Sequence, residues 1–146
     1  EIALSQKKVN DIYWPGMVHD IGKLLVPLDI LNKPGKLNDH EYEIIKKHPY
    51  WGYKALNSSK NLKKIARYVL YHHERWDGKG YPEGLKENEI PLLSQILAIG
   101  DAWDAMTSKR SYREPLIKAE AVKEIKKNKG KQFSPEVVDA FLQTDI

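Results

Sequence analysis

The clearest pattern of apolar positions lies in the middle of the chain. Five apolar residues there follow the i, i+3, i+4, i+7, i+8 spacing of a helix with one buried stripe: Leu62, Ile65, Ala66, Val69 and Leu70. His72 and His73 continue the stripe at its C-terminal end. The strongly apolar segment from Leu92 to about Ser108 predicts a second, central helix.

Capping and breaking residues predict the remaining helices. Ser5 opens a helix that we expect to run to about Ile21, kinked or broken near Trp14 by Pro15 and ended by Gly22. Further helices are expected at 38–47 after a capping box formed by Asn38 and Glu41, from Pro49 onward, at 117–129, and at 135–142.

Two segments rich in proline and glycine, 25–37 and 78–91, are expected to be loops. Strands have little support. The sequence therefore predicts an all-α fold, a helical bundle of about six or seven helices.

The amino-acid composition excludes more kinds of chemical site than the net charge does. The chain has 146 residues, the size of one domain, and contains no cysteine. This excludes a disulfide framework, a thiolate nucleophile and a cysteine-held zinc or iron–sulfur site. The net charge of +4 is mild and does not indicate DNA binding. Without an apolar span of about 18 residues or a signal-peptide pattern, we expect no membrane span and a cytoplasmic location.

Histidines stand out in segments that look buried. His19 and Asp20 are adjacent, and His72 and His73 close an amphipathic helix. Two neighbouring helical residues differ by about 100° around the axis, so both imidazoles can face inward only at a helix end. A buried imidazole needs a polar partner. It either binds a metal ion or has a purely structural role in which its nitrogens form hydrogen bonds.

The central helix carries two carboxylates on a face that is otherwise apolar. Asp101 and Asp104 follow Leu97 at i+4 and i+7. A carboxylate on the core side of a helix needs a cation, a metal or several donors, so Asp101 is the strongest single candidate. Asp104 either binds a ligand or forms an ion pair with Arg110 or Arg113.

Together, six side chains form a set of imidazoles and carboxylates: His19, Asp20, His48, His72, His73 and Asp101. Such ligands suit iron, manganese or zinc. Two or three ions held in this way generate a hydroxide near neutral pH and clamp a phosphoryl oxygen. Lys23, Arg110 and Arg113 are the cations available to neutralise phosphate charge.

Four stretches resemble the HD-GYP domain, a branch of the HD phosphohydrolase superfamily. They are residues 19–23 (HDIGK), 72–75 (HHER), 77–82 (DGKGYP) and 108–113 (SKRSYR). The resemblance runs from about Ser5 to Leu142, and the loop containing Tyr81 and Pro82, with its spacing from the histidine pair, is its most specific part.

The resemblance implies an all-helical bundle that hydrolyses cyclic di-GMP to linear pGpG, and in some members onward to GMP. It implies a centre of two or three divalent ions, iron or manganese, held by the six side chains named above. Asp20, Asp101 and Lys23 would act in catalysis, Lys23 on the scissile phosphate. Substrate contacts would come from Tyr81, Asp104, Arg110 and Arg113.

The resemblance also implies partners. The loop Asp77–Gly84 would contact a GGDEF-type protein, and an upstream sensor or receiver domain is expected. Members carry a further histidine upstream of the His-Asp pair, whereas none of the eighteen residues before His19 is histidine. We therefore expect residues 1–146 to be one such domain without its N-terminal helix. Two other functions remain open: a non-catalytic cyclic di-GMP sensor or interaction module, and a phosphohydrolase that acts on another nucleotide.

Overall fold

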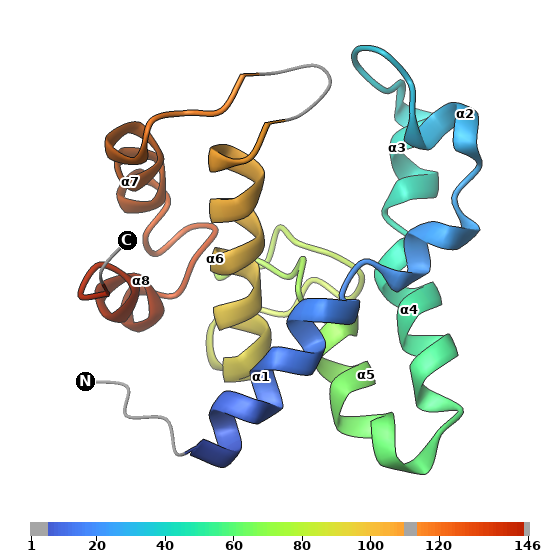
Figure 1. The fold of residues 1–146 in the computed structure, drawn as a ribbon, viewed down its shortest axis with the longest axis horizontal. Helices are drawn as coiled ribbons and strands as arrows, with labels where there is room; N and C mark the ends of the chain where they lie inside the picture. The colour runs from blue at the N-terminus through green and yellow to red at the C-terminus, as the bar shows by residue number, and fades with distance from the viewer. Residues whose placement is uncertain (1–5, 110–113, 145–146) are drawn as a thin grey trace.

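The computed structural model describes residues 6–109 and 114–144, and within them the fold is helical (Figure 1). The α-helices are α1 (Gln6–Val18), α2 (Leu28–Leu31), α3 (Asp39–Ile45), α4 (His48–Asn57), α5 (Lys63–Leu70), α6 (Leu92–Thr107), α7 (Lys118–Lys127) and α8 (Pro135–Phe141). Three short 3₁₀ helices join them: η1 (Ile21–Leu25), η2 (Lys60–Leu62) and η3 (Glu87–Glu89). The only β pairing among the described residues is one bridge between Lys129 and Phe133. These helices confirm the predicted all-α class.

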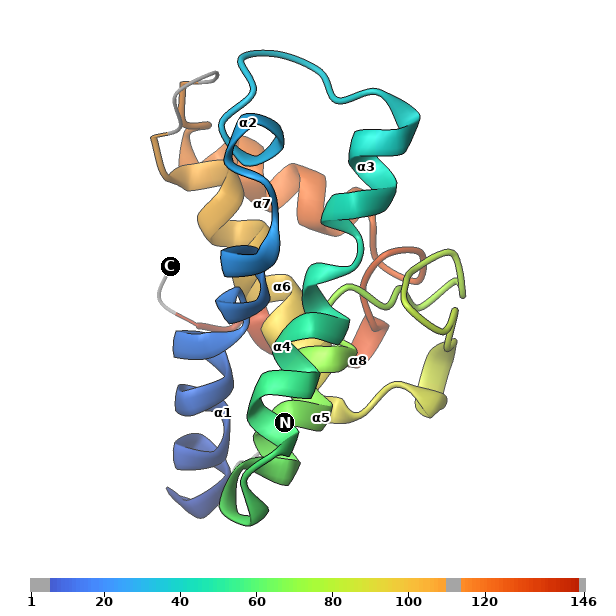
Figure 2. The same ribbon diagram turned by 90° about the vertical axis from the view of Figure 1, so that its right-hand side faces the viewer.

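The long helix α6 divides the molecule. On one side α7 and α8 pack against it, and on the other side lie α1 and α5, followed by α4 (Figures 1 and 2). Between α6, α7 and α8 the buried side chains form one core cluster of Ile99, Ile125, Phe133, Val137 and Val138. The predicted stripe of α5 is buried as well, with Ala66 and Val69 fully enclosed. Burial of these two faces fixes α5 and α6 as the frame on which the other helices pack.

The first part of the chain differs from the prediction. Helix α1 runs through Pro15 without interruption, ends at Val18, and is followed by a turn at His19 and Asp20. Gly22 is therefore not the residue that ends this helix; it lies inside η1. A glycine is required at position 22 because the backbone of α4 leaves no room for a side chain. A Cβ on Gly22 would lie 2.6 Å from the backbone nitrogen of Gly52 and closer still to the carbonyl oxygen of His48.

The capping box is confirmed. The Asn38 side chain accepts the Glu41 N–H at 2.9 Å, and the Glu41 carboxylate accepts the Asn38 N–H at 2.8 Å. Pro49 lies in the first turn of α4, as its lack of an N–H favours. The expected loop 25–37 contains the one-turn helix α2, because Pro27 precedes it with extended backbone and the chain turns immediately afterwards.

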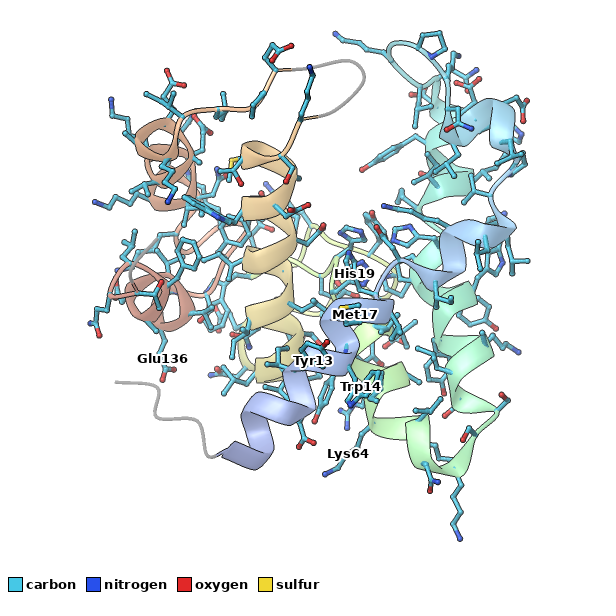
Figure 3. The ribbon with its side chains drawn as sticks, in the orientation of Figure 1. Tyr13, Trp14, Met17, His19, Lys64 and Glu136 are labelled. Carbon is cyan, nitrogen blue, oxygen red and sulfur yellow. The ribbon has the colours of Figure 1, made fainter. Side chains whose placement is uncertain are left out.

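One face of α1 presents apolar side chains to solvent. Tyr13, Trp14 and Met17 are all more than half exposed, and Figure 3 shows them along the helix just before His19. None of the described helices is both long and apolar enough to cross a lipid bilayer.

Candidate metal centre

The ends of three helices and the middle of a fourth converge on one small volume. His19 and Asp20 lie in the turn after α1, and Figure 3 shows His19 just past the end of that helix. His48 is the first residue of α4, His72 and His73 follow α5 directly, and Asp101 projects from the middle of α6. The fold thus brings together all six predicted ligands from segments that lie between positions 19 and 101 of the chain.

Short distances connect the members of this cluster. His19 Nε2 lies 3.4 Å from Asp20 Oδ2 and 3.6 Å from Asp101 Oδ1. His48 Nε2 lies 3.5 Å from Asp20 Oδ1. The ring centroids of His72 and His73 are 4.0 Å apart, and both rings lie within 5.4 Å of the His48 ring. No ligand-type side chain of the predicted set lies apart from the cluster.

Three of the histidines are oriented by the same backbone device. The Nδ1 atoms of His19, His48 and His72 donate to the carbonyl oxygens of Gly16, Ile45 and Val69, each three residues earlier, at 2.5–2.7 Å. A hydrogen bond at Nδ1 selects the tautomer whose Nε2 carries a free lone pair. These bonds therefore present Nε2 of all three rings as potential metal ligands.

Several polar atoms of the cluster are buried without a protein partner. Within the described residues, Asp20 Oδ1, His48 Nε2 and His72 Nε2 have no hydrogen bond, and His48 and His72 are each only 1% exposed. An unpaired buried polar group costs about 1–3 kcal/mol. In addition, one nitrogen from each of His48, His72 and His73 can be chosen so that all lie within 4.8 Å of one another. These buried nitrogen and oxygen atoms, with free lone pairs and no protein partner, are suitable ligands for a divalent cation.

Electrostatics keep these ligands in the form that binds metal. Burial lowers the pKa of His72 from 6.5 to about 4 and that of His73 to about 2, so both rings are neutral at pH 7. Burial lowers the pKa of His48 too. Burial opposes ionisation of Asp101, but the neighbouring His19 ring, with Nε2 3.6 Å from Asp101 Oδ1, holds the pKa of that carboxyl well below its usual range.

His19 is the exception in this group. Burial alone would lower the pKa of His19, but the contact with Asp101 and the hydrogen bond to the Gly16 carbonyl raise it above 6.5. The Asp101 carboxylate therefore favours the imidazolium form of His19. A divalent ion at Nε2 would compete with that proton.

Lys23 lies beside the cluster. Its Nζ donates to Asp20 Oδ2 at 2.7 Å, and the side chain is about one-third exposed. The ammonium group therefore faces solvent at the rim of the histidine cluster, where an anionic group of a ligand can reach it.

A cavity of about 460 Å³ opens from the cluster along one side of α6. Its cluster end is lined by His72, His73 and Asp101, and Tyr81 lies over His73 with ring centroids 5.0 Å apart. Burial raises the pKa of Tyr81, so its phenol stays protonated. The volume lies within the range of about 300–1,000 Å³ that is usual for small-molecule sites.

The loop that carries Tyr81 is held by Glu74. The Oε1 atom of this carboxylate accepts the N–H groups of Glu83 at 2.7 Å and Gly84 at 3.1 Å. Gly80 lets the loop lie against the histidine segment, because a Cβ there would come within 2.6 Å of the His73 carbonyl oxygen. These contacts explain why the loop after the histidine pair is rich in glycine.

Among the predicted substrate contacts, the outcomes differ. Tyr81 lines the cavity, and its contact with substrate stays a prediction. Asp104 is exposed, and its Oδ1 accepts the Ser108 hydroxyl at 2.8 Å, so the prediction that it shares the buried face of Asp101 is wrong. Three residues along a helix leave the two carboxylates about 60° apart, which suffices to bring Asp104 to the surface in the last turn. Arg110 and Arg113 lie outside the described residues.

Sequence reasoning missed two residues near the cavity. Glu74 had no assigned role, although a glutamate beside two histidines is the signal that would have drawn attention to it. Lys46 was not singled out in the sequence either. Its Nζ lies 5.6 Å from the Tyr42 ring centroid and 5.7 Å from that of Tyr81, and both tyrosines line the cavity. No sequence signal distinguishes Lys46 from the adjacent Lys47.

Comparison with known proteins agrees with this geometry. A family model described as an HD domain matches residues 1–137. A cyclic di-GMP phosphodiesterase of Thermotoga maritima is 46% identical over 99% of the chain and 40% of its own length. The cyclic di-GMP phosphodiesterase response regulator RpfG of Xanthomonas campestris pv. campestris is 39% identical over 98% of the chain and 38% of its own length.

Two proteins of Vibrio cholerae extend the comparison. The 3'3'-cGAMP-specific phosphodiesterase 2 is 39% identical over 97% of the chain and 27% of its own length. The crystal structure of the cyclic GMP-AMP specific phosphodiesterase V-cGAP3 superposes with a TM-score of 0.70 at 21% identity, over 99% of this chain and 40% of that one, which shows the same fold. The chain spans 40% or less of the length of these relatives.

Proposed function

This chain belongs to the HD domain family, and from that premise we propose that it is a metal-dependent phosphodiesterase that hydrolyses cyclic di-GMP to linear pGpG. The observation that carries the proposal is the buried cluster of unpartnered histidine and aspartate atoms at one end of a cavity. The relatives named as cyclic di-GMP phosphodiesterases support the choice of substrate.

The metal ions would be held by the six side chains of the cluster, His19, Asp20, His48, His72, His73 and Asp101. Two histidines and one carboxylate suffice for a single iron site, so a set of four histidines and two carboxylates supports two or three ions. Nitrogen and oxygen ligands without sulfur favour iron or manganese. When bound, such ions polarise a phosphoryl oxygen and supply a nucleophile from water at neutral pH.

The protein's own groups complete the site. Lys23, at the rim beside Asp20, would donate to a non-bridging oxygen of the scissile phosphate and stabilise the charge that develops there. Tyr81, whose phenol is protonated, would contact the substrate from one wall of the cavity. We propose Asp104, Arg110 and Arg113 as further substrate contacts on the basis of the sequence motif, with the arginines on the second phosphate.

Partners are proposed from the same motif. The loop Asp77–Gly84 has an exposed tip at Lys79, Pro82 and Glu83, which supports contact with a GGDEF-type protein. An upstream sensor or receiver domain and a cytoplasmic location stay predictions.

One second substrate has a specific observation in its favour. The relatives that act on 3'3'-cGAMP are as similar to this chain as several of those named for cyclic di-GMP. Both substrates are cyclic dinucleotides with the same phosphodiester ring, so the metal cluster serves either one, and the difference lies in recognition of the bases.

The test is turnover of a substrate panel. The chain is loaded anaerobically with Mn²⁺ or Fe²⁺ and incubated with cyclic di-GMP, 3'3'-cGAMP and cyclic di-AMP, and the products are separated by chromatography. We expect pGpG from cyclic di-GMP, and a loss of at least about 100-fold on Asp101→Asn. The matched control is Glu136→Gln, an exposed carboxylate of α8 distant from His19 in Figure 3, which should keep full activity. Absence of turnover with bound metal, or equal turnover by the Asp101 variant, contradicts the proposal. Binding of cyclic di-GMP in chelator, combined with no turnover when metal is bound, identifies a sensor.

A further inference from the structure

The cavity beside the histidine cluster has a second end, formed by α7 and the turn after it. Glu124, Asn128 and Gln132 line this end, with Met106 and the buried Phe133 beside them. Between the two ends, the wall is a face of α6 composed of Ala98, Ala102 and Ala105. Small side chains leave a flat apolar surface there, the kind against which an aromatic ring packs.

The polar groups at this end do not suit a phosphate. They are one carboxylate and two carboxamides, and none of the described residues that α7 and its following turn contribute to the lining is Lys or Arg. The exposed Lys127 of α7, outside the lining, places its Nζ 3.5 Å from Glu124 Oε1. The cation that does line the cavity, Arg75, belongs to the loop and is held by Asp77 through bonds of 3.0 and 2.8 Å. A carboxylate accepts N–H groups and repels anions, so this end suits a neutral group with several donors.

The turn after α7 is fixed to the glycine-rich loop. The Trp76 N–H donates to the Gln132 carbonyl at 3.2 Å, and the Asp77 N–H donates to the Lys131 carbonyl at 2.8 Å. The Asn128 side chain donates from Nδ2 to the Glu124 carbonyl at 2.8 Å, which leaves its Oδ1 as an acceptor. The α7 end of the cavity is therefore bound to the segment that carries the histidine pair.

We propose that this end of the cavity binds a guanine base of the substrate, with the Glu124 carboxylate accepting the N1–H and N2–H groups of the base. This inference rests on the proposed function, because the phosphodiester must lie at the histidine cluster for its base to reach α7. The alanine face of α6 packs against the purine ring, and Asn128 and Gln132 satisfy the remaining polar atoms of the base.

The chemistry of the base edges makes Glu124 a specificity residue. Guanine presents two neighbouring donors, N1–H and the N2 amino group, which match the two oxygens of one carboxylate. Adenine has an unprotonated N1 and no N2 amino group, so it would leave the carboxylate unpaired and face its charge with a lone pair. A site built in this way discriminates strongly against the base that lacks the donors.

The first experiment compares Glu124→Gln with Glu120→Gln, an exposed glutamate one turn earlier on α7 that is not part of the cavity lining. Steady-state kinetics are measured on cyclic di-GMP, cyclic di-AMP and bis(p-nitrophenyl) phosphate, a phosphodiester without bases. We expect Glu124→Gln to raise KM for cyclic di-GMP by about tenfold or more, because one charge-assisted pair is lost. Cleavage of cyclic di-AMP and of bis(p-nitrophenyl) phosphate should be unchanged, and Glu120→Gln should behave as the wild type.

The second experiment needs no turnover. Binding of GMP and of AMP to the chain in EDTA is titrated by NMR, and we expect a preference for GMP that Glu124→Gln abolishes. If the wild type cleaves no phosphodiester, the proposed function fails, and the GMP preference still decides this inference. An unchanged KM and an unchanged GMP preference in Glu124→Gln overturn it. Equal losses on all three phosphodiesters also overturn it, since they indicate a structural role for Glu124.

Discussion

Gly22 is the position where a single methyl group tests the geometry of the site. It lies in η1, two residues after Asp20, and passes directly against the start of α4. In Gly22→Ala the new Cβ would lie 2.6 Å from the Gly52 nitrogen and 2.9 Å from the His48 carbonyl carbon, where ordinary contact begins at 3.4 Å. All of these neighbours are backbone atoms, so no side-chain rotation relieves the overlap, and η1 must move away from α4.

The size of the effect follows from that displacement. The contact with the Gly52 nitrogen alone requires a separation of about 0.8 Å, and the still closer His48 carbonyl oxygen requires more. Overpacking of this kind costs about 1–3 kcal/mol. For a chain of this length, each kcal/mol corresponds to about 4 °C in Tm, so we expect Tm to fall by about 4–12 °C. The same movement separates Asp20 from His48, whose atoms are 3.5 Å apart. Metal ligands tolerate about 0.2 Å, so affinity for Mn²⁺ should fall by about tenfold or more.

The assay is thermal unfolding in EDTA and in Mn²⁺, with Gly100→Ala as the matched control. Gly100 is an exposed residue in the middle of α6, and a Cβ there would meet no atom within 4 Å. Alanine at this position should stabilise the protein by about 0.5–1 kcal/mol. If Gly22→Ala is as stable as the wild type in EDTA and gains the same stability from Mn²⁺, the close approach of η1 and α4 is wrong.

Three further predictions concern individual side chains. In EDTA, His72 should lower the free energy of unfolding by about 2 kcal/mol between pH 7 and pH 5. The pKa of its ring is about 4 in the folded protein and 6.5 in the unfolded chain, so the unfolded chain binds the proton first as the pH falls. In urea titrations, His72→Gln should lack this part of the decline. Glu74→Ala leaves two loop N–H groups without their acceptor, so the free energy of unfolding should fall by about 2–4 kcal/mol. Trypsin should then cleave the loop faster at the exposed Lys79. An unchanged digestion pattern would contradict the role of Glu74. Asp101→Asn should bind Mn²⁺ at least about tenfold more weakly by calorimetry, with its fold intact by circular dichroism.

Local signals were sufficient for most of the helices. The capping box at Asn38 and Glu41 and the apolar stripe that includes Val69 depend on neighbours within one or two turns, and both are confirmed. Gly22 shows where such reasoning fails. A glycine after a helical segment is typical of a helix end, but this glycine is required by the His48 carbonyl, which lies 26 positions away in the sequence and beside it only in the fold.

The candidate site was predictable to a similar degree. The residue types that bind metals are rare in apolar segments, so His72 and Asp101 stood out from the sequence, and the structure brings them together. Periodicity could not separate Asp101 from Asp104, because the difference of about 60° between them matters only once the partners of α6 are known. The cavity and its α7 end, with Glu124, arise from tertiary contacts that leave no local pattern.

Metal content tests the central claim most directly. The chain is purified anaerobically, loaded with Mn²⁺, desalted, and analysed for bound metal beside the double variant His72→Gln, His73→Gln. If the histidine cluster is a metal centre, the wild type retains two or three ions per chain, and the double variant loses at least one while its helical content is unchanged. Wild type that retains no metal, or a double variant that retains as much as the wild type, would contradict the account.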